Sequence, residues 1–124
     1  MSLMSGLCPS DEGDKSVCVV NGDIGQHFPN TDPAYKDIDS KILLEKTGQL
    51  VRARGYRVVN IDSTVTLESP KIMKHAPAMR ETIARILGAA IDDISIKATT
   101  TEQLGYVGRG EGLVAYATVL LESL

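Results

Sequence analysis

Apolar residues recur at helical spacing in two segments of the chain. In residues 40–54 the shared face consists of Leu43, Leu44, Thr47, Leu50 and Val51. In residues 77–87 it consists of Met79, Ile83, Ile86 and Leu87. Side chains three and four residues apart lie on one face of a helix, and glycine is common just past a helix end. Since Gly55 and Gly88 follow these segments, the pattern predicts two helices that each end at a glycine.

Apolar and polar residues alternate in three further segments, 56–67, 94–98 and 113–121. The first has one face of Val59, Ile61, Ser63, Val65 and Leu67. Its other face is Asn60, Asp62, Thr64 and Thr66. Alternation with a period of two is typical of strands. We therefore predict three strands, the first with a polar face that contacts solvent, a subunit or a ligand.

The predicted order is helix, strand, helix, strand, glycine-rich loop, strand. Strands joined through helices predict an α+β fold, a mixed β-sheet with helices packed on one face. A chain of 124 residues is one domain, and little else is left to cover the opposite face of the sheet. The polar face of the first strand is thus a candidate subunit interface.

Net charge, apolar runs and cysteine count limit the classes of partner and the cellular setting that we expect. A net charge of −3 argues against general affinity for nucleic acid or membranes, which requires a basic surface. No apolar run approaches the length of a membrane span. Cys8 and Cys18 are too few for a disulfide framework, so we expect a reducing, cytoplasmic setting.

The densest chemistry lies between the last two predicted strands. Three threonines and a carboxylate, residues 99–102, are followed by four glycines, Gly105, Gly108, Gly110 and Gly112. Glycine loops let backbone N–H groups approach an anion, Lys97 and Arg109 add donors, and Glu102 could hold a divalent cation against phosphate oxygens. Two interpretations stay open: a diphosphate–metal site, or a glycine-rich connection between core strands.

The N-terminal third carries weaker signals. Residues 1–21 predict a poorly ordered leader with at most a short strand at 17–20, and Asp11 and Asp14 there show no metal-ligand spacing. Residues 22–39 predict a turn-rich loop in which Asp23, Thr31 and Asp32 either bind a sugar hydroxyl or cap turns. We expect His27 at the surface and His75 at a helix start.

Three motifs, GDIGQHFPNTDPAYK, SPKIMKHAPAMR and IKATTTEQLGYVGRGEG, resemble 2-C-methyl-D-erythritol 2,4-cyclodiphosphate synthases over residues 22–124. The resemblance implies an enzyme of non-mevalonate isoprenoid biosynthesis, a phosphorus–oxygen lyase. It would convert 4-diphosphocytidyl-2-C-methyl-D-erythritol 2-phosphate to the cyclodiphosphate and CMP. It also implies a homotrimer with active sites between subunits.

The resemblance assigns site residues position by position. The residues that match contacts to the methylerythritol part and the flexible loop beside it are Asp23, Ile24, Gly25, Phe28, Pro29, Asn30, Thr31 and Asp32. The loop that matches the cytosine cradle is Leu67, Glu68, Ser69, Pro70, Lys71, Ile72 and Met73. The segment that matches the diphosphate grip is Thr99, Thr100, Thr101 and Glu102, with Tyr106 and Arg109 as further phosphate contacts.

Three of these positions carry particular roles in the resemblance. Thr100 matches the residue that stabilises the transition state, and Glu102 matches the ligand of a Mg²⁺ or Mn²⁺ that bridges the phosphates. Arg109 also matches a residue lining the central cavity of the trimer, where isoprenoid diphosphates bind.

The zinc-binding part of the family has no counterpart in these residues. Members carry Asp-x-His on a first strand and a further histidine on a first helix, whereas residues 1–21 contain no histidine. We therefore expect a domain at 22–124 without the first strand and helix of the family, no encoded Zn²⁺ site, and negligible turnover by this chain as written. The alternative is a catalytically inactive trimeric module that binds cytidine nucleotides or isoprenoid diphosphates.

Overall fold

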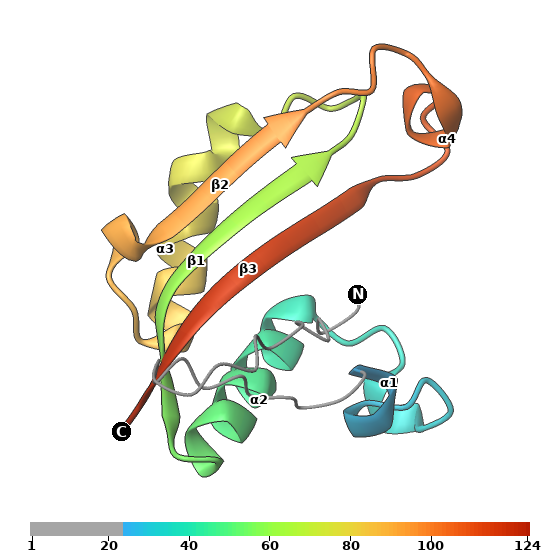
Figure 1. Cartoon of the computed structure of the whole chain (residues 1–124). Coiled ribbons are helices and arrows are strands. Elements are labelled where there is room, and N and C mark those ends of the chain that lie inside the picture. Colours follow the sequence, from blue (N-terminus) through green and yellow to red (C-terminus); the bar gives the residue numbers. More distant parts are fainter. Residues whose placement is uncertain (1–23) are drawn as a thin grey trace, which may run out of the picture. The chain divides into compact units, whose positions relative to one another are not determined.

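A three-stranded sheet organises the part of the chain that the structure, a computed structural model, describes: residues 24–124. β1 (Tyr56–Thr66) lies between β2 (Ile94–Thr99) and β3 (Val114–Ser123). β1 and β2 are parallel, paired from Ile61 opposite Ile94 to Thr66 opposite Thr99, and β3 runs the opposite way (Figure 1). The sheet is mixed and the fold is α+β, as the sequence predicted. The leader, the short strand expected at 17–20 and Asp23 lie outside the described residues.

The chain divides into two compact units, which in the described residues are 24–57 with 121–124, and Val58–Leu120. The first unit contains α1 (Ile24–His27), the 3₁₀ helix η1 (Pro33–Tyr35) and α2 (Ser40–Ala53). The Phe28 ring meets the Tyr35 ring edge-on, with centroids 5.5 Å apart. At the end of this unit the Leu124 N–H donates to the Gly55 carbonyl at 2.8 Å, and Arg57 pairs with Glu122.

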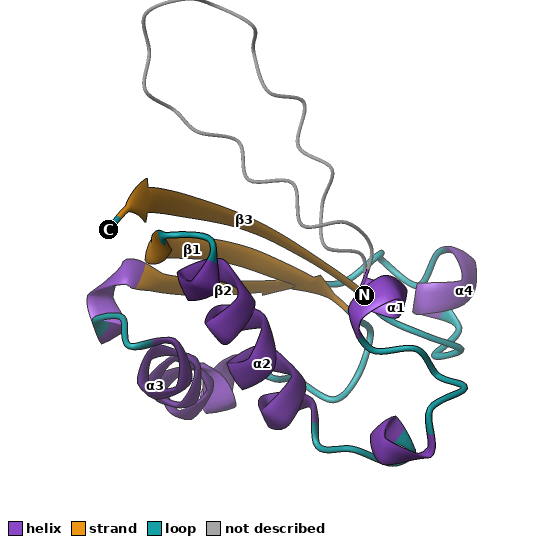
Figure 2. Cartoon of the chain, turned by 90° about the horizontal axis from the view of Figure 1, so that it is seen from below, coloured by secondary structure: helices purple, strands orange, loops and turns teal. Residues whose placement is uncertain are grey.

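The second unit contains two 3₁₀ turns, η2 (Met73–His75) and η3 (Ile91–Asp93), and two helices, α3 (Ala76–Leu87) and α4 (Gly105–Gly108). α3 connects β1 to β2 and packs against β2, so the parallel pair has a helix on one side (Figure 2). The core of this unit is formed by Leu67, Ala76, Ala84, Ile94, Ile96 and Val107.

The face that α3 buries differs from the sequence prediction. Met79, Ile83, Ile86 and Leu87 are only half-buried, whereas Ala76 and Ala84 are 6% and 3% exposed. Alanine lets a helix backbone approach a neighbouring strand closely, and periodicity weighted toward large side chains overlooks it. The alternation of β2 is observed as predicted, because Ile94 and Ile96 are buried while Ser95 and Lys97 are exposed.

Arg80 fastens α3 to the start of β2. Its Nε donates to the Ile94 carbonyl at 2.7 Å and its Nη2 to the Ile91 carbonyl at 2.9 Å. Both carbonyls lie outside the helix that carries Arg80, so one guanidinium satisfies two backbone acceptors where η3 enters the strand. The side chain is one-third exposed, which places these bonds at the edge of the core.

Capping residues explain where the helices begin and end. Asp39 accepts from the Lys41 N–H at 2.9 Å and starts α2. Gly88 ends α3 with φ of 70°, a left-handed conformation that favours glycine. Both predicted helices and all three strands are therefore confirmed to within two residues. The sequence missed the short α1, η1 and α4, which lie in segments predicted as loops.

In residues 24–124, no helix combines the length and the apolar character needed to cross a membrane.

Candidate functional site

Two of the predicted site segments meet where β1 and β2 end. Because parallel strands end at the same edge of a sheet, residues after Thr66 lie beside residues after Thr99 (Figure 1). The Leu67 N–H donates to the Thr99 carbonyl at 3.0 Å. The Thr101 N–H then donates to Glu68 Oε2 at 3.4 Å. The structure thus joins the predicted cytosine loop, residues 67–73, to the predicted diphosphate segment, residues 99–102.

The 67–73 loop is anchored at one end and open at the other. Leu67 is 8% exposed and belongs to the core. Ser69, Pro70, Lys71 and Met73 are exposed, and Ile72 is half-buried. The loop closes into η2, where the His75 N–H donates to the Ile72 carbonyl at 2.8 Å. His75 precedes α3 as its N-cap residue, which agrees with its predicted place at a helix start.

The 99–102 segment is held by its own hydroxyl groups. Thr100 Oγ1 accepts from the Glu102 N–H at 3.3 Å. Thr101 Oγ1 donates to the Leu104 carbonyl at 2.7 Å, and the Leu104 N–H returns to the Thr101 carbonyl at 3.0 Å. These bonds close a tight turn that leaves the Glu102 side chain exposed.

The turn places two ordinary residues in the left-handed region. Glu102 has φ of 53° and Gln103 has φ of 64°. Each such residue costs about 1–2 kcal/mol relative to the right-handed conformation. Backbone strain of this kind concentrates at functional sites. Here one of the strained residues is Glu102, whose carboxylate is predicted to hold a metal ion.

The glycine-rich segment packs against this turn through Gly108. Gly108 lies so close to Gln103 that a Cβ on it would stand 2.2 Å from the Gln103 carbonyl carbon. Val107, the neighbour of Gly108 in α4, is 4% exposed and fixes the helix to the core. Composition alone suggested that the glycines approach a ligand, but Gly108 approaches the backbone of its own chain.

Tyr106 within α4 and Arg109 at its C-terminal cap are both exposed. Tyr106 is 51% exposed. The Arg109 guanidinium donates from Nε and Nη2 to the two carboxylate oxygens of Glu111, at 2.9 and 3.2 Å. Arg109, the predicted phosphate contact, therefore forms an ion pair with Glu111 in this structure. The two residues are only two positions apart, so the sequence already offered a signal for this pair.

The remaining predicted residues belong to the first unit. Gly25, Phe28, Pro29, Asn30, Thr31 and Asp32 lie in or after α1, and Ile24 begins that helix. Asp32 caps η1, because its Oδ1 accepts from the Ala34 N–H at 2.9 Å. Of the two interpretations for Asp32, turn capping is the one the structure contains.

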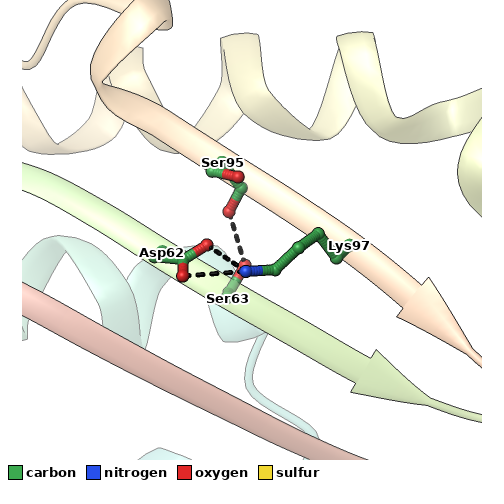
Figure 3. Close-up of polar contacts among 4 residues, drawn as sticks. All are labelled: Asp62, Ser63, Ser95 and Lys97. Carbon is green, nitrogen blue, oxygen red and sulfur yellow. Dashed lines mark hydrogen bonds and ion pairs between the residues drawn. The ribbon is translucent and has the colours of Figure 1, made fainter.

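Lys97, considered from sequence as an anion donor, pairs instead with Asp62. Its Nζ lies 2.7 and 2.8 Å from the two Asp62 oxygens (Figure 3). These hydrogen bonds hold the pKa of Asp62 below its ordinary value of 3.8. Nearby, Ser63 Oγ donates to the Ser95 carbonyl at 2.9 Å. The Asp62–Lys97 pairing depends on strand register, which sequence alone does not supply.

The metal ligands implied by the resemblance fit only in part. Across residues 24–124, no group of three or more His, Cys, Asp or Glu side chains is positioned to hold a metal ion. A tetrahedral Zn²⁺ site therefore does not fit the described residues. Mg²⁺ is commonly held by one or two carboxylates together with substrate phosphates, and the exposed Glu102 carboxylate at the end of β2 suits that mode.

Comparisons with known proteins show the family to which the chain is similar. The YgbB family model matches residues 16–122. The 2-C-methyl-D-erythritol 2,4-cyclodiphosphate synthase of Bacteroides thetaiotaomicron is 60% identical over 100 residues, 81% of this chain and 63% of that protein. The chain thus spans less than two-thirds of that relative's length.

Solved structures give the same result for the fold. The bifunctional IspDF of Campylobacter jejuni is similar with a TM-score of 0.79 and 40% identity, over 83% of this chain and 28% of that chain. The CDP complex of IspF from Plasmodium falciparum is similar with a TM-score of 0.69 and 29% identity, over 82% and 60% of the two chains. The resemblance inferred from the three motifs is confirmed: this chain belongs to the YgbB family.

Proposed function

We propose that this protein acts in the reaction of its relatives, the cyclisation of 4-diphosphocytidyl-2-C-methyl-D-erythritol 2-phosphate with release of CMP. The observation that carries the proposal is the joining of the 67–73 loop to the 99–102 segment by two hydrogen bonds. One segment would hold the cytosine and the other the diphosphate of a single nucleotide. A structural neighbour that is a CDP complex supports this class of ligand.

The proposed reaction explains what the 99–102 segment would have to do. A 2-phosphate oxygen must attack the β-phosphorus of the diphosphate, so two anionic groups must meet. Unit charges roughly 3 Å apart repel by ~5 kcal/mol at an effective dielectric of about 20. In the proposal, Thr100 stabilises the charge that develops on the diphosphate, and the backbone of residues 99–102 orients it. A Mg²⁺ or Mn²⁺ at Glu102 would supply further neutralisation of phosphate charge when bound.

Nucleotide binding is the first test of this site. Calorimetry should detect CDP binding, which Thr100→Ala and Lys71→Ala should each weaken severalfold, because each removes a donor from the proposed site. Glu81→Ala is a matched surface control, since Glu81 is exposed on α3. Heats of binding that neither Thr100→Ala nor Lys71→Ala alters would place the site elsewhere.

Turnover is a separate question. The whole chain has two histidines, His27 and His75, and the described residues hold no three-ligand cluster. We therefore expect CMP release from the authentic substrate, with Zn²⁺ and Mg²⁺ supplied, to be slower than that of a relative that carries the zinc ligands by roughly a thousandfold. That factor corresponds to a loss of ~4 kcal/mol of transition-state stabilisation. Release at the relative's rate would contradict this expectation.

We also propose a homotrimer. Its support is the surface of β3 and the residue before it, where four large apolar side chains are 45–64% exposed: Leu113, Tyr116, Val119 and Leu120. Exposed apolar side chains along a strand mark an interaction surface, and isoprenoid diphosphates are proposed ligands of the cavity near Arg109 in that assembly. Light scattering tests the proposal, and a monodisperse monomer at micromolar concentration would reject it.

A further inference from the structure

The parallel ladder between β1 and β2 ends in an unusual way. Thr66 opposite Thr99 is the last strand pair, and the Leu67 N–H continues the ladder to the Thr99 carbonyl at 3.0 Å. In a regular parallel ladder the next donor, the Thr101 N–H, would turn back to a backbone carbonyl of the first strand. Here it donates to the Glu68 carboxylate at 3.4 Å. A side chain thus takes the place of a backbone acceptor where the sheet stops.

This contact links two segments that are 33 residues apart in the sequence. Glu68 and Thr101 are both half-buried, and a hydrogen bond to a carboxylate is stronger than one between neutral groups. The bond restrains the peptide between Thr100 and Thr101. It therefore bears on Thr100, whose hydroxyl accepts from the Glu102 N–H.

The placement of a negative charge here needs an explanation. A carboxylate beside a segment proposed to bind diphosphate repels the ligand, so direct contact with phosphate is a poor role for Glu68. Its Oε2 is instead occupied by the Thr101 amide. Hydrogen bonding to the backbone, rather than charge, is the property of Glu68 that the geometry uses.

We infer that Glu68 is a positioning residue: it couples the 67–73 loop to the 99–102 segment, so that the base and the diphosphate of one nucleotide are held in fixed relation. The inference rests on the proposed function for the identity of the ligand. The hydrogen bond between Thr101 and Glu68 lies within the chain and does not depend on a ligand.

Glu68→Ala, Glu68→Gln and the matched control Glu81→Ala separate the possible roles. Glutamine keeps an acceptor oxygen and removes the charge, whereas alanine removes both. We expect Glu68→Ala to weaken CDP binding about tenfold, as for a lost hydrogen bond to a charged group. Glu68→Gln should restore at least half of that loss on a logarithmic scale, and Glu81→Ala should bind CDP like the unmodified protein.

The Thr101 amide provides a second readout that needs no ligand. In ¹⁵N-resolved hydrogen exchange, this N–H should exchange faster in Glu68→Ala than in the unmodified protein, while Glu68→Gln retains protection. An unchanged Thr101 exchange rate in Glu68→Ala would overturn the inference whether or not CDP binds.

The binding data give further ways to fail. If Glu68→Ala and Glu68→Gln bind CDP equally weakly, or if both bind it more tightly than the unmodified protein, the charge of Glu68 dominates. Either result would also overturn the inference. Failure of the unmodified protein to bind CDP would count against the proposed function alone.

Discussion

Gly108→Ala should be the most damaging small substitution in the described chain, because of the backbone that faces Gly108. An added Cβ would stand 2.2 Å from the Gln103 carbonyl carbon, 2.6 Å from its oxygen and 2.7 Å from its Cα. These are roughly 1 Å short of ordinary van der Waals contact. All three atoms are backbone, so no side-chain rotation can relieve the overlap.

The loss of stability in Gly108→Ala depends on how far the backbone around residues 103 and 108 can move. Gly108 is held by its N–H, which donates to the Leu104 carbonyl at 3.1 Å, and by Val107 in the core. Gln103 is already in the left-handed region. Overpacking typically costs 1–3 kcal/mol, and with both sides fixed we expect about 3 kcal/mol. At a urea slope of ~2 kcal/mol/M, the unfolding midpoint would fall by about 1.5 M.

Neighbouring glycines supply matched controls for the same side-chain change. At Gly112 the new Cβ would meet the Tyr106 ring at 3.4 and 3.5 Å, an ordinary contact, so Gly112→Ala should change stability by less than about 0.5 kcal/mol. At Gly110 the space is open but φ is 73°, so Gly110→Ala should cost about 1 kcal/mol. Urea denaturation of the three variants measures the order. A Gly108→Ala midpoint equal to that of Gly112→Ala would refute the steric argument.

Two further expectations concern side chains of the second unit. Arg80→Ala should lower the free energy of unfolding by about 2 kcal/mol, because it leaves the Ile91 and Ile94 carbonyls without their guanidinium donor; Arg80→Lys should recover less than half, since an ammonium lacks the planar fork. Thermal denaturation at fixed pH measures both, and an Arg80→Ala protein as stable as the unmodified one would contradict the reasoning. For Asp62, the folded-state pKa lies below the ordinary value of 3.8, so the stabilising contact with Lys97 is fully present above that value and is lost as pH falls through the lowered pKa. The stability difference between the unmodified protein and Asp62→Asn should therefore begin to shrink as pH falls below 3.8 and disappear only once pH is well below the lowered pKa of Asp62. A difference that stays constant across the acid range would assign it to something other than the carboxylate.

The sequence predicted the elements of the sheet better than their contacts. Periodicity located α2, α3 and the three strands, because each has a long apolar repeat and a glycine or polar boundary. It misjudged the buried face of α3, since Ala76 and Ala84 carry little hydrophobic weight and are buried by close approach. It could not find α1, η1 or α4, which are too short to show a period.

For the candidate site, too, the sequence predicted which segments matter better than it predicted their contacts. Motifs brought the 67–73 loop and the 99–102 segment to attention, and the parallel pairing of β1 and β2 placed them side by side. The bond from Thr101 to Glu68, the pair formed by Asp62 and Lys97, and the packing of Gly108 on Gln103 all depend on strand register or turn geometry. Residue types alone do not specify such pairings across a sheet.

The parallel pairing also has a kinetic consequence. Thr66 and Thr99 are paired across the sheet, and the chain between them contains α3 and crosses back to the start of β2. Contacts between residues so distant in sequence form late, since the entropy of closing the intervening loop opposes them. The two halves of the proposed nucleotide site are therefore expected to come together only in the step that pairs β1 with β2. A ligand that bridges them should slow unfolding while leaving the rate of folding nearly unchanged.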